Sequence, residues 1–223
     1  MIVITTYNGK FHLERLLNEL NNLDLLGHKI LVVDSGTNDS ESINYLNYLK
    51  ENNSNFNYEL LLDKTPNPNY DSGVIIHVMK NYNEEYYIFI HDSFSIKNNE
   101  CLVELNRLMD GENSVVPFLT FGGNQYDNKN QINFCSTHYG TGNNKCGIFA
   151  SIFGISNKSI SKIDLNSLVG PSNKDESRAM ERCWSVIFEK SGLNIIPFEG
   201  EFDYTKIIND EYVYFRKYFG DRQ

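Results

Sequence analysis

The sequence is poor in several features that point to particular classes of protein. It has 20 lysines and arginines against 29 acidic residues, so its net charge is −9. A nucleic-acid surface needs clustered basic residues, and this charge argues against one. No apolar run is long enough to cross a membrane, and a strand-like run begins directly after Met1, which argues against a signal peptide. We therefore expect a cytoplasmic protein, with any membrane association peripheral.

Cysteines are also few, and internal repeats and linker-like segments are absent. No two of the four cysteines have the spacing of a CxxC motif. This pattern argues against a zinc site or a disulfide framework and indicates a reducing compartment. With 223 residues, of which 40% are hydrophobic and 22% charged, the chain predicts one soluble domain, residues 1–223, with a sizeable core.

Strand-like and helix-like patterns alternate through the first half of the chain. Short apolar runs predict strands, and apolar residues three or four positions apart predict helices. The predicted strands are residues 2–5, 29–33, 58–62 and 86–90, and the predicted helices are residues 11–26, 40–53 and 72–81. In the second helix we expect Ser40 to be the N-cap and Ile43 to face the core. This alternation predicts an α/β fold with a mostly parallel central sheet flanked by helices.

The second half is less regular. We expect helices at residues 98–109 and 174–191 and strands at residues 115–121, 146–155 and 193–197. Residues 125–145 are rich in Asn, Gly, Thr and Tyr and predict an active-site loop. Residues 209–219 predict an aromatic helical tail, and the basic residues at this end of the chain are Arg216, Lys217 and Arg222. The tail either packs against the domain, contacts a phosphate or docks another domain.

Two of the predicted strands run directly into an aspartate. Residues 29–33 precede Asp34, and residues 86–90 precede His91 and Asp92. Open α/β sheets bind their ligands at the carboxyl edge of the strands, and carboxylates are ligands that divalent cations prefer. The pattern therefore predicts a polar-ligand site at this edge, suited to a divalent cation.

Five segments, in this order along the chain, resemble the motifs of glycosyltransferases with the GT-A fold, close to the inverting family-2-like group. They are Thr5-Thr6-Tyr7-Asn8, Val33-Asp34-Ser35-Gly36-Thr37-Asn38-Asp39, Asn67-Pro68-Asn69-Tyr70-Asp71-Ser72-Gly73, His91-Asp92-Ser93 and Glu181-Arg182-Cys183-Trp184. The resemblance covers most of the chain. It implies a GT-A (nucleotide-diphospho-sugar transferase) fold, with a donor-binding half at about residues 1–97 and an acceptor and catalytic half at about residues 98–223.

The resemblance also implies roles for individual residues. Those expected to bind the donor are Thr5, Thr6, Tyr7, Asp34, Asp71, Ser72, Gly73 and Asp92. Asp92 and His91 are the expected ligands of Mn²⁺ or Mg²⁺, although His-Asp-Ser retains only one carboxylate of the family's Asp-x-Asp motif. Glu181 is the expected catalytic base, with Asp175 and Glu176 as competitors.

Several of these residues have structural alternatives. Asp34 can cap the turn that follows it, and Asp71 or Ser72 can be an ordinary N-cap. The threonines can serve a turn at Asn8-Gly9. Glu181 can be an exposed helix residue paired with an arginine.

The resemblance implies an enzyme that moves a hexosyl or related sugar from a nucleoside-diphosphate sugar, with UDP favoured, to a hydroxyl of a glycan, lipid or protein. Inversion and a role in polysaccharide biosynthesis are the expected details. The alternative is a non-catalytic GT-A-like module that binds a nucleotide sugar or glycan, or a scaffold within a larger protein. A nucleotidyltransferase is a third option, which the Thr6–Lys10 segment fits poorly because it lacks the expected Gly-rich basic loop.

Overall fold

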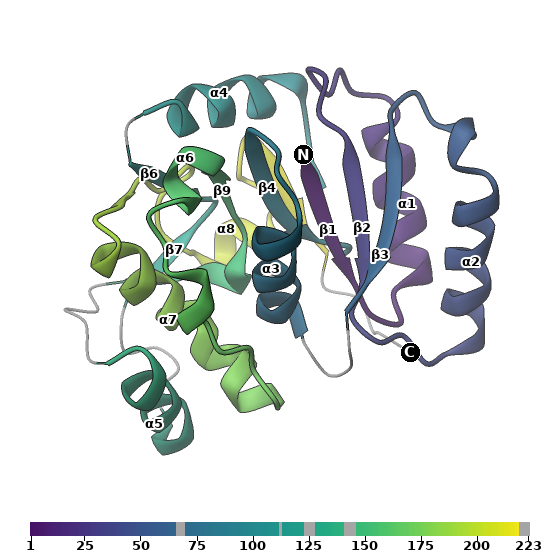
Figure 1. Cartoon of the computed structure of the whole chain (residues 1–223). Coiled ribbons are helices and arrows are strands. Elements are labelled where there is room, and N and C mark those ends of the chain that lie inside the picture. Colours follow the sequence, from purple (N-terminus) through teal and green to yellow (C-terminus); the bar gives the residue numbers. More distant parts are fainter. Residues whose placement is uncertain (66–69, 112, 123–127, 141–145, 219–223) are drawn as a thin grey trace.

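A seven-stranded mixed sheet forms the centre of the computed structural model, which describes residues 1–65, 70–111, 113–122, 128–140 and 146–218 (Figure 1). The strand order is β10-β6-β9-β4-β1-β2-β3. Four neighbouring strands are parallel, namely β1 (Ile2–Thr6), β2 (Ile30–Asp34), β3 (Leu60–Lys64) and β4 (Tyr86–His91). The predicted α/β fold with a mostly parallel sheet is confirmed.

Helices cover both faces of the sheet because successive strand residues face opposite sides. In β1, Val3 belongs to the core beneath α3 (Tyr70–Asn81) and α7 (Lys174–Lys190), and Ile2 and Ile4 belong to the core on the other face. The helices on that second face are α1 (Lys10–Leu20), α2 (Ser40–Glu51) and α4 (Asn99–Met109). In Figure 1, α3 lies in front of the sheet and α1 behind it.

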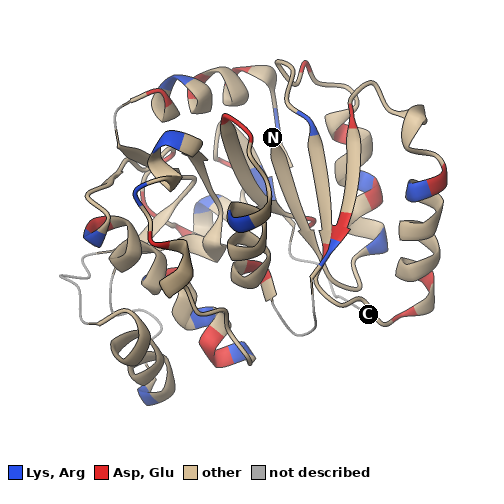
Figure 2. Ribbon diagram, viewed as in Figure 1, with Lys and Arg blue, Asp and Glu red and all other residues tan. Residues whose placement is uncertain are grey.

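Three further strands extend the sheet, and short helices lie in the connections between the main elements. Strand β9 (Phe153–Ser156) runs antiparallel between β4 and β6 (Ser114–Pro117), and β10 (Asn194–Ile195) is parallel to β6. The short helices are η1 (Asn53–Asn55), α6 (Asn157–Ile160) and η3 (Leu165–Ser167). In Figure 2 the positions of charged residues, coloured blue and red, lie mostly on helices and loops, and most of the strand ribbon is tan. No helix among the described residues is both long and apolar enough to span a membrane.

Two predicted strands are each divided. The predicted strand at residues 115–121 forms β6 and β7 (Thr120–Gly122), and the one at residues 146–155 forms β8 (Cys146–Ile148), η2 (Phe149–Ser151) and β9. The break in the second lies at Ala150 and Ser151, whose φ angles of 52° and 54° are left-handed. Two successive non-glycine residues in this region are strained, and apolar periodicity cannot reveal such a break.

The loop predicted at residues 125–145 contains a helix, α5 (Lys129–His138). The side chain of Asn128 caps it by accepting from the Gln131 backbone N–H at 3.0 Å. Residues 123–127 and 141–145 lie outside the described part of the chain. The helix was not predicted because only one side of α5 is buried, so most of its residues are polar.

The helical tail predicted at residues 209–219 is wrong. The helix in this region is α8 (Tyr204–Ile208), and the chain then forms β11 (Phe215–Lys217), which pairs antiparallel with β5 (Phe94–Ile96). Phe215 is buried against Phe94, with ring centroids 4.7 Å apart. The aromatic residues are therefore placed by pairing with a distant strand.

Details of α2 also differ from the prediction. Asp39 is the N-cap, because its side chain accepts from the Ser42 N–H at 2.8 Å, and Ser40 is the first helical residue. Ile43 is 40% exposed rather than inward.

Candidate active site

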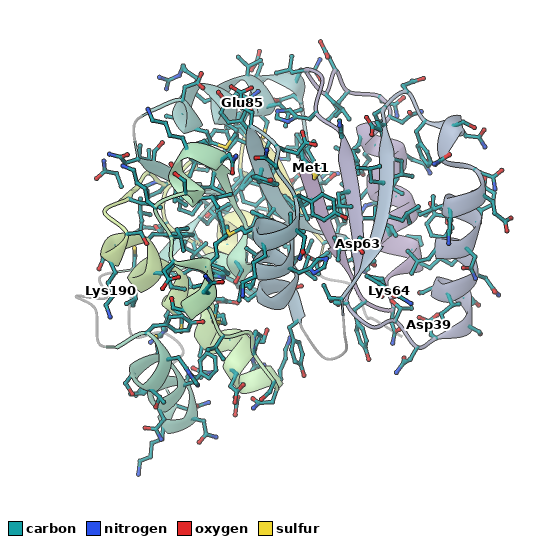
Figure 3. The ribbon with its side chains drawn as sticks, viewed as in Figure 1. Met1, Asp39, Asp63, Lys64, Glu85 and Lys190 are labelled. Carbon is teal, nitrogen blue, oxygen red and sulfur yellow. The ribbon has the colours of Figure 1, made fainter. Side chains whose placement is uncertain are left out.

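The carboxyl edge of the parallel strands brings together most of the residues predicted for the site. The register places Thr6 beside Asp34 on β2 and Thr5 beside His91 on β4. Figure 3 marks this edge by Asp63 and Lys64 of β3, whereas Met1 marks the opposite edge. The prediction that two strands bring Asp34 and Asp92 to one edge of the sheet is consistent with this register, in which β1 lies between β2 and β4.

Asp34 shapes the loop that follows β2. Its Oδ1 accepts the backbone N–H groups of Gly36 at 3.0 Å and Thr37 at 2.7 Å, so the turn-capping alternative holds for this oxygen. The side chain is only partly buried. Among the described residues none donates to Oδ2, and this second oxygen can accept from a ligand.

The loops after β1 and β2 are joined by Asn8. Its Oδ1 accepts from the Asn38 N–H at 2.8 Å, and its Nδ2 donates to Asn38 Oδ1 at 2.8 Å. Asn8 has a φ of 49°, which asparagine tolerates better than most residues. The turn predicted at Asn8-Gly9 is thus part of the site, with the partly buried Tyr7 beside it.

Thr5 and Thr6 are buried in β1, with exposed fractions of 5% and 3%. Thr6 Oγ1 donates to Asp92 Oδ2 at 2.9 Å. The Thr6 hydroxyl thus joins β1 to the residue that follows β4. The expected contact of Thr5 and Thr6 with a donor stays a prediction.

Asp92 is fully buried under the loop after β1. A Cβ placed on Gly9 would lie 1.9 Å from Asp92 Oδ2, so only glycine allows the loop to approach the carboxylate this closely. The Asp92 carbonyl accepts from Arg15 Nη2 at 3.2 Å. The position at the strand end is as predicted, but the carboxylate points beneath the loop.

The side chains at His91, Asp92 and Ser93 do not match the expected metal-ligand set. His91 Nε2 lies 3.3 Å from Asp71 Oδ2, and Ser93 Oγ accepts from Lys217 Nζ at 2.7 Å. No group of three His, Cys, Asp or Glu side chains suited to a metal occurs within the described ranges. The Gly9 loop covers Asp92 Oδ2, so this oxygen is not open to a Mn²⁺ or Mg²⁺ ion.

Glu181 lies on α7 and is partly buried beside η2. Burial, followed by the negative charge of Asp71, raises the pKa of Glu181 from 4.5 to about 8. The nearby charges of Lys174 and Arg178 and a hydrogen bond from the Ala150 backbone N–H act in the opposite direction. The exposed-helix alternative for Glu181 is therefore wrong. We call the two carboxylates Glu181 and Asp71, together with the adjacent His91, the carboxylate cluster.

Ser72 and Gly73 are buried inside the first turns of α3, which begins at Tyr70. Ser72 Oγ accepts from the indole N–H of Trp184 at 3.0 Å and lies 3.3 Å from Ser151 Oγ. Neither Ser72 nor Asp71 is the N-cap, because both lie within the helix, and Asn67 to Asn69 lie outside the described residues. Ser72 joins α3 to α7, and the expected contacts of Asp71, Ser72 and Gly73 with a donor stay predictions.

Asp175 and Glu176 lie in the first turn of α7. The Glu176 carboxylate accepts from both the backbone N–H and the hydroxyl of Ser172 at 2.7 Å, so it caps the helix. Both residues line a cavity of about 310 Å³ between α5 and α7. The helix start explains Glu176 better than a catalytic role does.

Sequence reasoning missed Arg15 and gave Lys217 no defined place. Arg15 lies above the ring of Tyr218, with 3.4 Å between its Cζ and the ring centroid. Lys217 reaches Ser93 because β11 pairs with β5. The run Tyr212-Val213-Tyr214-Phe215 is aromatic and β-branched, a composition that favours a strand.

No protein-family model and no curated protein matches this sequence. Solved structures do match its fold. Residues 1–349 of S. aureus TarS, in complex with UDP-GlcNAc, align with a TM-score of 0.53 and 13% identity over 99% of this chain and 59% of that one. The mannosyltransferase PcManGT from Pyrobaculum calidifontis, with GDP-Man and Mn²⁺, aligns with a TM-score of 0.54 and 12% identity over 88% of this chain and 53% of that one.

GalNAc-T7 with UDP, GalNAc and Mn²⁺ gives a TM-score of 0.52 and 10% identity over 82% of this chain and 40% of that one. The chain thus spans at most 59% of the length of these three structures. At such low identity the likeness establishes the fold, and the expected GT-A fold is confirmed.

Proposed function

We propose that this chain transfers a sugar from a nucleoside-diphosphate sugar to an acceptor hydroxyl, with inversion at the anomeric carbon. The observation that carries the proposal is Glu181. In a GT-A fold, a carboxyl group with a pKa of about 8 lies near the carboxyl edge of the sheet, beside Asp71. A base whose pKa is close to neutral is suited to take a proton from a hydroxyl.

The donor half is assigned to residues 1–97, and UDP is the favoured nucleotide. Asp34 Oδ2 accepts from the base or from a ribose hydroxyl, and Tyr7 packs against the base. These roles are supported by the partial exposure of both residues and by the fixed loops around Asn8. Residues from 98 onward carry the catalytic base, Glu181, and the acceptor site for a glycan, lipid or protein hydroxyl.

In the proposed reaction, the acceptor oxygen attacks the anomeric carbon as Glu181 takes its proton. The bond from that carbon to the diphosphate oxygen breaks, and its electron pair leaves with the diphosphate. The Ala150 N–H orients the Glu181 carboxylate, and Asp71 keeps its proton affinity high. Attack opposite the leaving group gives inversion.

A divalent cation is part of the expectation from the sequence, and PcManGT and GalNAc-T7 were solved with Mn²⁺. In this chain Asp92 is covered by the Gly9 loop and Ser93 contacts Lys217. These contacts do not suit a cation, and we assign it no step.

The alternative is a non-catalytic module that binds a nucleotide sugar or a glycan. It is favoured by one specific observation, the buried position of the single carboxylate left in the Asp-x-Asp motif. The two functions differ in turnover but can share donor binding.

A two-stage experiment separates them. Calorimetry with UDP-, GDP-, dTDP- and CMP-sugars, with and without Mn²⁺, first identifies the donor. Hydrolysis of that donor, in which water replaces the acceptor, is then compared between the wild type and Glu181→Gln. We expect slow hydrolysis that Glu181→Gln abolishes. Binding without any hydrolysis supports the non-catalytic module. Failure to bind any of the four donors contradicts the proposed transfer and leaves only a module that binds a glycan.

A further inference from the structure

The strand β11 fixes Lys217 at the end of β4. Lys217 pairs with Phe94 in the antiparallel register, and the Tyr218 N–H donates to the Ser93 carbonyl at 2.9 Å. The Lys217 ammonium donates to Ser93 Oγ at 2.7 Å. Both the backbone and the side chain therefore hold this lysine one residue from Asp92.

A second cation lies on the same strand end. The Arg15 guanidinium donates to the Asp92 carbonyl and stacks on Tyr218. Its Nε is 3.6 Å from Glu19 Oε1, so an acid already offsets this charge. Arg15 is therefore suited to position Tyr218, and through it the end of β11.

The chemistry of this strand end suits an anion better than a metal ion. A divalent cation needs oxygen ligands, but the Gly9 loop covers Asp92 Oδ2 and Ser93 Oγ accepts from an ammonium. The Lys217 ammonium repels a metal ion and attracts a diphosphate. Lys217 is only partly buried, and its contact with Ser93 places it at this edge of the sheet.

We propose that Lys217 supplies the positive charge that stabilises the leaving nucleoside diphosphate, in the place where a metal ion was expected. The inference rests on the proposed function. As the bond between the anomeric carbon and the β-phosphate oxygen breaks, negative charge grows on that phosphate. The Lys217 ammonium, positioned by Ser93, stabilises this charge and keeps its own proton.

The test measures affinity rather than turnover. Calorimetry in EDTA compares UDP with uridine, and GDP with guanosine, for the wild type, Lys217→Gln, Lys217→Arg and Arg216→Gln. We expect Lys217→Gln to weaken diphosphate binding by about 10- to 100-fold, the usual effect of one charge-assisted hydrogen bond, without changing nucleoside binding. Lys217→Arg should retain most of the affinity.

Arg216→Gln is the matched control. Arg216 is the neighbouring cation on β11, but it is exposed and paired with Asp210. Its loss should leave diphosphate binding unchanged. Circular dichroism and thermal melting check that each variant folds. Should Lys217→Gln fail to fold, Lys217→Met is measured instead, because it retains the apolar stem. The salt dependence of the wild type is a second test, since diphosphate affinity in EDTA should fall as the NaCl concentration rises.

The results distinguish this inference from the proposed function. Diphosphate binding that requires Mn²⁺ and is unchanged in Lys217→Gln overturns the role of Lys217 and leaves the proposed function intact. Salt-independent diphosphate binding in EDTA overturns it as well. Failure of the wild type to bind any nucleoside diphosphate, with or without Mn²⁺, contradicts the proposed function itself.

Discussion

The indole nitrogen of Trp184 lies 3.0 Å from the hydroxyl of Ser72, and this hydrogen bond joins the helix that carries Glu181 to the helix that carries Asp71. Ser72 Oγ also lies 3.3 Å from Ser151 Oγ, next to Ala150. Three segments that determine the pKa of Glu181 therefore meet at one buried serine. The only tryptophan is a core residue that positions the carboxylate cluster.

Trp184→Phe tests this connection. The change removes the indole N–H and leaves the buried Ser72 hydroxyl without that donor, so we expect the free energy of unfolding to fall by about 1–3 kcal/mol. Urea denaturation measures the change. Phe11→Leu is the control, because Phe11 is 74% exposed and its substitution should stay within about 0.5 kcal/mol. Equal stability of the two variants would contradict the proposed connection.

Gly9→Ala tests the close approach of the loop to Asp92. The added Cβ would lie 1.9 Å from Asp92 Oδ2, and the loop must move to accommodate it. We expect a loss of about 1–3 kcal/mol in the free energy of unfolding, as for other overpacked sites. Gly122→Ala is the matched control, since nothing lies within 4 Å of its Cβ and the φ of Gly122 is not left-handed. A neutral Gly9→Ala would show that the loop does not cover Asp92 closely in solution.

Asp34 combines a turn contact with a proposed ligand contact, and two substitutions separate them. Asp34→Asn keeps an oxygen for the N–H groups of Gly36 and Thr37 but removes the charge and one acceptor. We expect near-normal stability and weaker nucleoside binding. Asp34→Ala should additionally lose about 0.5–2 kcal/mol of stability, as when a cap is removed. Thermal melting and uridine calorimetry measure the two effects, and unchanged uridine affinity in both variants would remove Asp34 from the donor site.

The raised pKa of Glu181 also predicts how stability depends on pH. Between its ordinary value of 4.5 and about 8, the folded state keeps a proton that the unfolded state loses. The stability of the wild type should therefore fall, relative to Glu181→Gln, as pH rises through this window, by at most about 1.4 kcal/mol per pH unit. Below pH 4.5 and above about pH 8 the difference should be constant. Parallel stability curves for the two proteins would show that the pKa is not raised.

Much of the fold was predictable because its local patterns are strong. The strands β1 to β4 are short apolar runs followed by turn residues, and α7 combines a capping Asn173 with a long apolar stripe. The strand β11 was not predictable in this way. Its aromatic residues fit either a helix or a strand, and pairing with β5, more than 110 residues earlier in the chain, decides between them.

The site was predictable in position but less so in detail. Strand ends located Asp34, His91 and Asp92 at one edge, because parallel strands deliver their carboxyl ends together. The burial of Asp92 depends on a loop from another strand, and the contact of Lys217 with Ser93 depends on the chain returning to this edge. Spacing along the sequence carries no information about either contact.

The final prediction concerns Glu181 as the catalytic base. Glu181→Gln is nearly isosteric, so donor affinity should stay close to that of the wild type while transfer falls by about 10²–10⁴-fold, the usual contribution of a positioned base. Because only the deprotonated carboxylate accepts a proton, wild-type transfer should rise with pH and level off above about pH 8. Removing the Asp71 charge by Asp71→Asn lowers the pKa of Glu181 and should move this rise to lower pH. A pH series of initial rates with the identified donor measures both effects. Near-normal transfer by Glu181→Gln would reject Glu181 as the base, and Asp175 would then be the next residue to test.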